Sequence, residues 1–399
     1  MSGVRSFRFA GELPASKSIL NRLLVIGSFA APGEFTVRGE SNADDVRHLR
    51  EGLAALADGR PADCGAAGTV FRFLALRASR LPGRHRLTGT PRLLARPIAP
   101  LIDVLRRLGA NAEIATGDDA ALVVEGDGRW TLDRPIEVER SRSSQFASAV
   151  LLSAWELSGP LRLRFSGDPV SEAYLTMTVA LVRNAGLSVD TGDEEWIVAP
   201  GARVRPGEHR AEMDLGAAFA VAAAAAVAGE AELAPFPVPS LQSDRVFVDI
   251  LAAMGVPLEQ LGDTLVVKRA EALRPIDWNL RDSPDLFPVL SVLAALADGP
   301  SRLLGAPHLG LKESDRLARS AALVAALGRA FEPHPDGLVI HGQGRKRHDR
   351  PIEFDTDQDH RLAMAAGVAI KAGFDVKVTD PGVVAKSFPD FWSAIGETP

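Results

Sequence analysis

The 399-residue chain is predicted to fold as an α/β protein with two similar domains. Its length exceeds the size at which one hydrophobic core usually keeps growing, so two domains are expected. A helical pattern occurs six times along the chain, and short β-branched or alternating segments separate the copies. Such alternation of helices with short strands is typical of the α/β class.

Each copy of the pattern begins with polar residues or glycine, continues as an apolar or Ala-rich helix and ends at Gly or Pro. These openings recur about every 70 to 75 residues after a first gap nearer 50, at Ser16, Ala66, Ser143, Asp214, Ser283 and Asp357. A second helix follows each one, from Asp44, Arg96, Ser171, Ser243, Glu313 and Ser387. Segments such as HRLTG, ALVVEG and TLVVKR read as strands. The predicted unit is strand–helix–strand–helix–strand–strand, with three units in each domain and the first helix of each unit buried.

The longest apolar run lies around Leu215–Ala228 and is too short to span a bilayer. The N-terminal residues contain no long apolar segment of the kind found in signal peptides. We therefore expect neither secretion nor a membrane anchor. The Ala richness of the run indicates instead a helix surrounded closely by neighbours.

Charge and cysteine content exclude several classes of protein. The net charge of −6 argues against a general nucleic-acid binder, which would have a basic surface. The single cysteine, Cys64, excludes an intramolecular disulfide and a Cys-based zinc site, and it fits a reducing cytoplasm. Positive charge used for function must therefore be concentrated locally.

One such concentration is the stretch APHLGLKESDR, directly ahead of a predicted helix with Ser314 as expected N-cap and Gly328 as expected stop. Lys312 and Arg316 would lie in the first turn, where the free N–H groups and the helix dipole favour an anion. Glu313 is a candidate proton donor in the same cluster. An ordinary capped helix with a solvated, charged start is the alternative.

Seven cations lie at the openings of predicted elements in this acidic protein. They are Lys17, Arg22, Arg96, Lys312, Arg316, Arg361 and Lys386. If they converge, they specify substrates that carry several negative charges. Asp285 precedes the apolar run LFPVLSVLAAL and is a candidate base with a perturbed pKa. Helix capping and solvated helix ends are the structural alternatives for these residues.

Ten short motifs resemble, in order, those of 5-enolpyruvylshikimate-3-phosphate synthases. They are KSxxNR at Lys17–Arg22, DDVRH at Asp44–His48, AGTxxR at Ala67–Arg72, ARPI at Ala95–Ile98, SSQF at Ser143–Phe146, SxxY at Ser171–Tyr174, PD at Pro284–Asp285, KESDR at Lys312–Arg316, DHRxAM at Asp359–Met364 and AKSFPDFW at Ala385–Trp392. Each motif alone is a weak signal. Together they span nearly the whole chain in register.

The resemblance implies the enolpyruvyl transferase fold, an inside-out α/β barrel in which each of two domains holds three βαβαββ units around buried helices. Domain I would comprise residues 1–14 and 213–399, on the phosphoenolpyruvate side, and domain II residues 15–212, on the shikimate 3-phosphate side, with hinges near 14–15 and 212–213. Closure of the two domains would expel water and align the reactants.

The resemblance also implies an activity. Members of the family transfer the enolpyruvyl group of phosphoenolpyruvate to the 5-hydroxyl of shikimate 3-phosphate through a tetrahedral intermediate and release phosphate. This transferase step belongs to the shikimate pathway, which leads to chorismate and the aromatic amino acids. The family uses neither a metal nor an organic cofactor, and its members are usually monomers. Both substrates carry phosphate and carboxylate groups, which accounts for seven cations on an acidic protein.

Site residues follow from the resemblance position by position. The shikimate 3-phosphate ligands would be Lys17, Ser18, Arg22, Ser143, Ser144, Gln145, Ser171, Tyr174, Asp285 and Lys312. The phosphoenolpyruvate ligands would be Lys17, Gly68, Arg96, Gln145, Arg316, Arg361 and Lys386. Among these, Asp285 would take the 5-hydroxyl proton, while Lys17 and Lys312 would stabilise the charges of the intermediate. Glu313 would protonate the methylene carbon.

Two positions depart from the family's pattern. The usual Asn of GNAGT is Ala66 here, and an Asn often found shortly before the lysine of KESDR is His308. We expect altered affinity for phosphoenolpyruvate rather than lost activity. Gly68 retains the small residue whose replacement by Ala is associated in the family with glyphosate resistance, so sensitivity to glyphosate is expected.

Three other functions stay open at this stage. The sister transferase acting on UDP-N-acetylglucosamine usually has Lys-Asn where this chain has Lys17-Ser18, and a Cys or Asp where it has Pro91. A paralogue acting on another cyclic hydroxy-acid could explain Ala66 and His308. A non-catalytic scaffold with a relic of the fold is disfavoured, because a degenerate copy should have lost some of the candidate catalytic residues.

Overall fold

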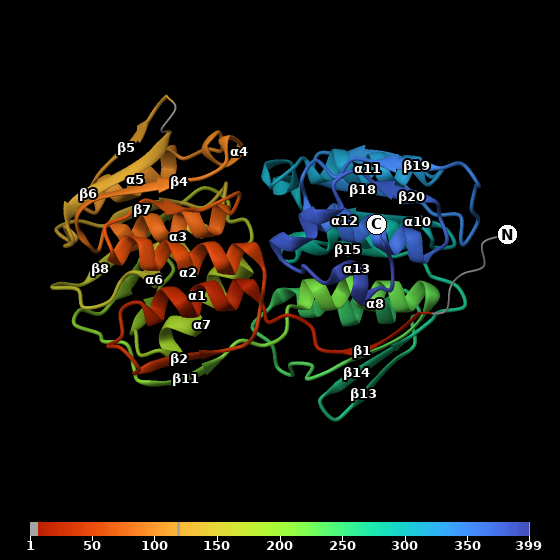
Figure 1. Ribbon diagram of the computed structural model, residues 1–399, viewed down its shortest axis with the longest axis horizontal. Helices are drawn as coiled ribbons and strands as arrows, with labels where there is room; N and C mark the ends of the chain where they lie inside the picture. The colour runs from red at the N-terminus through yellow and green to blue at the C-terminus, as the bar shows by residue number, and fades with distance from the viewer. Residues whose placement is uncertain (1–6, 118–119, 399) are drawn as a thin grey trace. The chain divides into compact units, whose positions relative to one another are not determined.

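A computed structural model describes residues 7–117 and 120–398 of the chain (Figure 1). The chain divides into two compact units. Unit 1 comprises Met1–Ala15 and Glu212–Pro399, and unit 2 comprises Ser16–Ala211. Unit 1 is therefore assembled from both ends of the chain, and unit 2 from one continuous segment.

Unit 2 contains the elements from α1 to β11. Its helices are α1 Lys17–Gly27, α2 Asp44–Ala57, α3 Gly68–Ala78, α4 Pro91–Leu94, α5 Ala99–Arg107, α6 Gln145–Leu152 and α7 Glu172–Asn184. Its strands are β2 Phe35–Arg38, β3 Ala62–Asp63, β4 Pro82–Thr88, β5 Asn111–Ala115, β6 Ala121–Asp127, β7 Ile136–Glu139, β8 Leu161–Ser166, β9 Val189–Thr191, β10 Trp196–Val198 and β11 Gly207–Arg210.

Unit 1 contains β1 and all elements from α8 onward. Its α-helices are α8 Leu215–Ala228, α9 Phe247–Ala253, α10 Phe287–Ala295, α11 Arg316–Ala326, α12 His360–Lys371 and α13 Phe391–Ala394. Short 3₁₀ helices are η1 Ser243–Val246, η2 Pro284–Leu286, η3 Pro307–Leu311 and η4 Pro381–Lys386. Its strands are β1 Phe7–Gly11, β12 Gly229–Leu233, β13 Leu258–Leu261, β14 Thr264–Lys268, β15 Asp277–Asn279, β16 Pro300–Leu304, β17 Ala330–His334, β18 Gly337–His341, β19 Ile352–Phe354 and β20 Val376–Val378.

The sheets repeat one topology. In the described part of the chain, four sheets have four strands each, in the orders β1-β12-β14-β13, β3-β4-β6-β5, β7-β8-β10-β9 and β15-β16-β18-β17. In each of them the first two strands are parallel and the rest antiparallel, as when Phe7 pairs with Gly229 in the parallel pair and Glu230 with Lys268 in the antiparallel one. The other two repeats contribute only parallel pairs, β11-β2 and β19-β20.

A short connection explains the β11-β2 sheet. Only residues 58–61 separate α2 from β3. This segment is too short for a further pair of strands and its turn. The predicted repeat is thus complete in four units and abbreviated in two.

Three helices pack together inside each unit. In unit 1 they are α8, α10 and α12, and in unit 2 they are α1, α3 and α6. Every residue of α8 is buried, because its alanines let neighbouring backbones approach from all sides. Figure 1 shows α8 between the strands β1 and β14 on one side and the helices α10 and α12 on the other. The buried helix predicted for Leu215–Ala228 is present with those bounds.

Arginine side chains satisfy the carbonyl groups at the buried ends of these helices. Arg345 donates from Nη1 to the carbonyl oxygen of Val227, at 2.6 Å, near the end of α8. Arg329 donates from Nε to the carbonyl oxygen of Ala295, at 2.8 Å, at the end of α10. These cations match the negative end of each helix dipole and bond carbonyls that have no partner within the helix.

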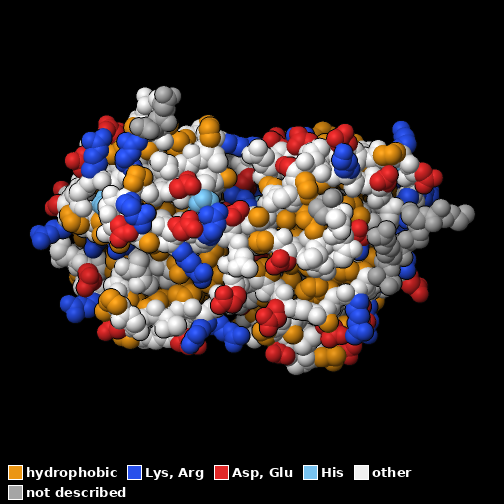
Figure 2. Space-filling model, viewed as in Figure 1, with side chains coloured by type: hydrophobic (Ala, Val, Ile, Leu, Met, Phe, Trp, Pro, Cys, Tyr) orange, Lys and Arg blue, Asp and Glu red, His pale blue; other side chains and the backbone are white. Residues whose placement is uncertain are grey.

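The visible face of each unit is mixed in charge (Figure 2). Figure 2 shows Lys and Arg side chains interspersed with Asp and Glu on the visible face. Among the described residues, no helix has both the length and the apolar character that crossing a bilayer requires.

Candidate active site

Arg316 is the centre of the charged cluster in unit 1. It is the first residue of α11 and only 1% exposed, and its guanidinium group donates to three carboxylates. Nε lies 2.7 Å from Oδ2 of Asp359, Nη1 lies 2.8 Å from Oδ1 of Asp285, and Nη2 lies 2.9 Å from Oε2 of Glu313. Each of the three guanidinium nitrogens thus donates to a different carboxylate. Arg316 thereby fixes the positions of three acidic groups.

Asp285, in η2 at the entrance to α10, also faces two further cations. Its Oδ1 lies 3.6 Å from Nζ of Lys312, and its Oδ2 lies 3.8 Å from Nη2 of Arg361. Burial would raise the pKa of Asp285, but Lys312, Arg316 and Arg361 outweigh burial and lower this pKa well below its usual range. Asp285 is therefore an ionised hydrogen-bond acceptor.

Glu313 and Lys386 complete the cluster. The Nζ of Lys386, a buried residue of η4, lies 3.9 Å from Oε1 of Glu313, which is about one-fifth exposed at its side chain. The structure thus brings together all six residues predicted for this unit: Asp285, Lys312, Glu313, Arg316, Arg361 and Lys386.

The predicted N-cap of the helix after this cluster is wrong by one residue. Asp315, not Ser314, is the N-cap of α11, and its side chain accepts from the backbone N–H of Ala318 at 3.0 Å. Ser314 instead donates its hydroxyl to Asp359 at 3.0 Å. Lys312 and Glu313 therefore precede the helix rather than occupying its first turn. Gly328 follows the helix with φ of +76°, as expected of a glycine stop.

Two buried titratable groups beside the cluster have opposite pKa shifts. Asp244, in η1, is 6% exposed, and its burial together with the neighbouring Asp285 raises its pKa to about 7. His308, in η3, is 5% exposed, and its burial together with Lys312 lowers its pKa to about 4. Near neutral pH, His308 is therefore uncharged and Asp244 retains a proton for part of the time.

These shifts predict opposing pH dependences of stability. Between about pH 4 and 7 the folded protein holds a proton on Asp244 that the unfolded chain lacks, so stability falls as the pH rises. Below about pH 6.5 the unfolded chain protonates His308 and the folded protein does not, so stability falls as the pH drops towards 4. Relative to wild type, Asp244→Asn should lose stability on acidification and His308→Asn should gain it, by up to about 1.4 kcal/mol per pH unit.

Denaturant unfolding of the three proteins at several pH values between 4.5 and 6.5 measures this difference. The double variant should return to a pH dependence close to that of wild type, because two opposing contributions are removed together. Parallel curves for wild type and both single variants would contradict the assignment.

Arg22 is a deeply buried cation of unit 2. It lies in α1, and burial lowers its pKa to about 10. It donates to Oγ1 of Thr178 at 2.7 Å and to the carbonyl oxygens of Ser18 and Tyr174 at 2.8 and 3.1 Å. Within residues 7–117 and 120–398, no carboxylate forms an ion pair with Arg22. A buried guanidinium with neutral partners is suited to bind an anion that arrives from outside.

Lys17, the first residue of α1, forms an ion pair within unit 2. Its Nζ lies 2.8 Å from Oδ2 of Asp45, a buried residue in the first turn of α2. Both side chains are largely shielded, with 13% and 7% exposure. Asp45 therefore orients the Lys17 ammonium group.

Gln145 connects α6 to α3. It is the first residue of α6, and its Oε1 accepts from Nη1 of Arg72 at 2.9 Å. Its Nε2 donates to Oγ1 of Thr69 at 2.9 Å. Ser143 accepts from the backbone N–H of Gln145 at 3.2 Å, and Ser144 is buried at the N-cap position of the helix. The three residues of the SSQ sequence thus lie together at one helix start.

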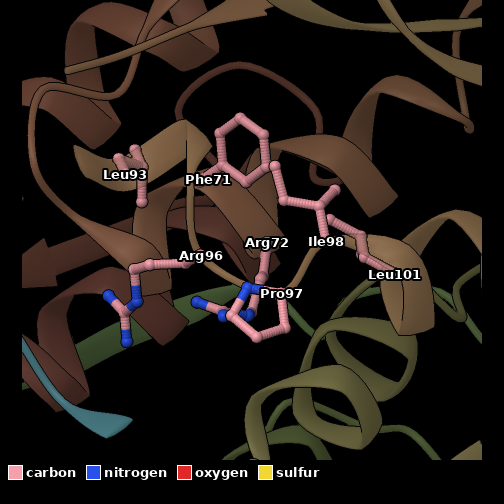
Figure 3. Close-up of a pocket in the computed structure, with 7 residues that line it drawn as sticks. All are labelled: Phe71, Arg72, Leu93, Arg96, Pro97, Ile98 and Leu101. Carbon is pink, nitrogen blue, oxygen red and sulfur yellow. The ribbon is translucent and has the colours of Figure 1, made fainter. Parts of the chain in front are cut away.

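Arg72 and Arg96 line a shallow, open pocket in unit 2, and Gly68 lies next to both guanidinium groups. The pocket is lined by Phe71, Arg72, Leu93, Arg96, Pro97, Ile98 and Leu101. Figure 3 shows both guanidinium groups on one side of this pocket, away from Phe71 and Leu93. A Cβ atom placed on Gly68 would lie 2.5 Å from Nη1 of Arg72 and 2.5 Å from Nη1 of Arg96. Only glycine lets both cations approach this helix start so closely.

Ser171 has a backbone conformation that is unusual for a serine. It precedes α7 with φ of +53° and ψ of +41°, in the left-handed region, and is 6% exposed. Such strain is retained where the surrounding structure requires a particular orientation. Tyr174 follows in the first turn of α7 and holds Arg22 through its carbonyl oxygen.

Sequence reasoning assigned no role to several residues that hold these side chains. They are Asp45, Thr69, Arg72, Asp244 and Asp359. All except Asp244 lie in motifs noted above, and Asp244 lies at the opening of a predicted helix. All five lie at or near the start of a helix, and this position is the signal that could have marked them.

Comparison with known proteins identifies a family. The family model described as EPSP synthase (3-phosphoshikimate 1-carboxyvinyltransferase) matches residues 57–395. A 3-phosphoshikimate 1-carboxyvinyltransferase from Methanosphaerula palustris is 36% identical over 417 residues, covering 96% of this chain and 95% of the relative. A protein with the same name from Mycobacterium ulcerans is 34% identical over 406 residues, covering 95% and 92%.

Solved structures share the fold. EPSP synthase from Acinetobacter baumannii matches with a TM-score of 0.76 and 22% identity, covering 98% of this chain and 96% of that one. The enolpyruvyl transferase NikO from Streptomyces tendae matches with a TM-score of 0.75 and 18% identity, covering 98% and 95%. The predicted fold class is confirmed by both neighbours.

Proposed function

The chain belongs to the EPSP synthase family, and we propose that it transfers the enolpyruvyl group of phosphoenolpyruvate to the 5-hydroxyl of shikimate 3-phosphate and releases phosphate. Curated relatives that carry the name 3-phosphoshikimate 1-carboxyvinyltransferase support this activity along nearly the full chain. The observation that carries the proposal is Arg22, a fully buried cation with neutral protein partners.

Arg22 supplies the positive charge for shikimate 3-phosphate in unit 2. Its burial strengthens the attraction to an anion, because water screens the charges less. Hydroxyl and amide groups at the starts of α1, α6 and α7 then complete the shell for this substrate. They come from Ser18, Ser143, Ser144, Gln145, Ser171 and Tyr174.

The proposed ligands of phosphoenolpyruvate are cations, together with the backbone of Gly68. In unit 2, Arg96 and the backbone of Gly68 lie beside the pocket, and Lys17 contributes an ammonium group. In unit 1 the ligands are Arg316, Arg361 and Lys386. Arginine can bind a carboxylate or phosphate through two parallel hydrogen bonds.

Asp285 is the proposed acceptor of the 5-hydroxyl proton. In the structure, Lys312, Arg316 and Arg361 lower its pKa and so make it a weak base. Anionic substrates that bind these cations would partly neutralise them and raise the basicity of Asp285. Proton transfer would then depend on the presence of the substrates. Lys17 and Lys312 would stabilise charge on the tetrahedral intermediate, and Glu313 would protonate the methylene carbon.

The direct test is phosphate release from the purified protein with phosphoenolpyruvate and each acceptor in turn. We expect release with shikimate 3-phosphate and none with UDP-N-acetylglucosamine. Release with only the second acceptor would identify the sister transferase. Release with neither would favour a paralogue with another hydroxylated acceptor or a non-catalytic protein.

Gly68→Ala should weaken binding of phosphoenolpyruvate and inhibition by glyphosate. The added methyl group would meet both Arg72 and Arg96, so the two guanidinium groups must move away from the helix start. Loss of one charge-assisted hydrogen bond weakens binding about 10- to 100-fold, and we expect the KM for phosphoenolpyruvate to rise within this range. The KM for shikimate 3-phosphate should change less.

Steady-state phosphate release with glyphosate titration measures both effects. The wild-type enzyme should be inhibited, since Gly68 leaves the helix start open. Wild-type activity that persists at high glyphosate, or equal changes in both KM values in the variant, would contradict this prediction.

We further propose that the enzyme acts as a monomer in the cytoplasm. The single cysteine has no partner in the chain for a disulfide, which fits a reducing compartment. Burial raises the pKa of the Cys64 thiol well above its usual range, so it is a poor nucleophile. Size-exclusion chromatography with light scattering would test the oligomeric state.

A further inference from the structure

The side-chain amide of Gln145 is held from both ends by one helix. Its oxygen accepts from Arg72, and its nitrogen donates to Thr69, each at 2.9 Å. Thr69 and Arg72 lie three positions apart in the first turns of α3, so they present neighbouring side chains. We propose that Arg72 and Thr69 are positioning residues that hold the Gln145 amide in one orientation, so that Gln145 meets the anionic substrates only as a hydrogen-bond donor. This inference rests on the substrate role proposed above for Gln145.

Arg72 is itself held firmly enough to act in this way. It is 6% exposed, and the nitrogen that contacts Gln145 also donates to the carbonyl oxygen of Gly68 at 2.9 Å. Its guanidinium carbon lies 5.2 Å from the ring centre of Phe146, the residue after Gln145. Contacts with α3 on one side and α6 on the other thus fix the position of the donor.

The chemistry of the two partners selects the orientation of the amide. A guanidinium group has only donors, so the part of the amide that faces Arg72 must be the acceptor oxygen. The hydroxyl of Thr69 can accept, and it faces the NH₂ group. A flipped amide would place two donors against each other at Arg72 and would leave the amide oxygen without its partner. One orientation is therefore strongly preferred.

This orientation decides what Gln145 can offer to a ligand. Its oxygen already accepts from Arg72, and one of its two N–H groups is given to Thr69. The second N–H is the group left for a ligand, and the Thr69 hydroxyl retains its own proton as a neighbouring donor. Both are suited to phosphate or carboxylate oxygens. Neither donor can accept a hydrogen bond from a substrate hydroxyl group.

A double-mutant cycle between Arg72→Met and Gln145→Ala tests the positioning role. Arg72→Met should lower kcat/KM about 10- to 100-fold in the wild-type background, because the amide loses its fixed orientation. In the Gln145→Ala background the same change should have less than about a threefold effect, because the positioned group is already absent. Arg72→Lys keeps a cationic donor and should recover part of the activity.

Arg77→Met is the matched control. Arg77 also lies in α3 and donates through its guanidinium group, to Oγ of Ser28 at 2.8 Å and to its carbonyl oxygen at 3.2 Å. It contacts the end of α1 rather than Gln145. Arg77→Met should lower the thermal unfolding midpoint and leave both KM values unchanged. Arg72→Met should change the KM values even when its midpoint is lowered by the same amount.

Two results would overturn the inference, and they can be told apart. Equal losses from Arg72→Met in both backgrounds would show a purely structural role for Arg72 while leaving the role of Gln145 intact. Wild-type kcat/KM in Gln145→Ala would instead remove the proposed substrate role of Gln145 and the inference with it. If Arg72→Met does not fold, Gln145→Glu decides the matter. This variant keeps an acceptor for Arg72 but has no N–H, so wild-type KM values in it would refute the donor role.

Discussion

Arg316→Met is expected to destabilise unit 1 by about 3–5 kcal/mol and to abolish turnover. Arg316 is almost fully buried and is bonded to Asp285, Glu313 and Asp359. Methionine fills most of the same volume but leaves three carboxylates close together without their shared cation. An intact buried ionic network adds little to the free energy of unfolding compared with apolar residues of the same volume. Removing one partner lowers this free energy strongly, because it leaves uncompensated charges in the interior.

The loss of Arg316 should also change the protonation of its neighbours. Arg316 is one of three cations that lower the pKa of Asp285, so this pKa should rise in the variant. Repulsion between the remaining carboxylates would be relieved by protonation. We therefore expect the free energy of unfolding of the variant to increase as the pH falls from 7 towards 5, and to increase more than that of wild type. Denaturant unfolding at several pH values measures both the loss and its pH dependence.

Arg319→Met provides the matched control on the same helix. Arg319 lies three residues further along α11 and pairs with Asp355 at 2.6 Å, with side chains 32% and 59% exposed. Water screens such a pair, and its loss should cost no more than about 1 kcal/mol. Similar losses for the two variants would contradict the central role of Arg316. Wild-type turnover in folded Arg316→Met would contradict its role as a phosphoenolpyruvate ligand.

Local patterns predicted the helices well. Composition and spacing were enough to predict the helix at Leu215–Ala228 and the repeated helix openings. A helix buried on all sides has apolar residues on every face, and this is visible in the sequence. The short helix α4, Pro91–Leu94, was not predicted, since four residues are too few to show a helical period. The N-cap of α11 was misplaced by one residue because Ser314 and Asp315 are both good caps.

Contacts between distant residues could not be predicted from such patterns. The hydroxyl of Ser314 donates to Asp359, 45 positions along the chain, and Asp315 is the N-cap in its place. Arg72 meets Gln145 across 73 positions. The motifs located these residues, but only the packing of the helices shows which of them hold others in place. Roles in positioning are therefore the part of the site that the sequence conceals.

Glu313→Gln is expected to slow turnover about 10²- to 10⁴-fold, the usual contribution of a general acid. Glu313 accepts from Arg316 at 2.9 Å and lies 3.9 Å from Nζ of Lys386, so it is held between two cations. Glutamine has nearly the same shape, and its amide oxygen can still accept from Arg316. It cannot deliver a proton to the methylene carbon. Binding of shikimate 3-phosphate should stay nearly unchanged, as measured by calorimetry beside phosphate-release kinetics.

Glu397→Gln separates proton donation from the loss of a charge. Glu397 pairs with the buried Lys371 at 2.8 Å and is also largely shielded, with 13% exposure. Its replacement removes one carboxylate from an ion pair of unit 1, as Glu313→Gln does, but no proton transfer is assigned to it. Stability should fall modestly in both variants, and turnover should fall only in Glu313→Gln. Wild-type turnover in Glu313→Gln would refute the role of proton donor, and Lys386, its neighbour at the same site, would become the candidate acid.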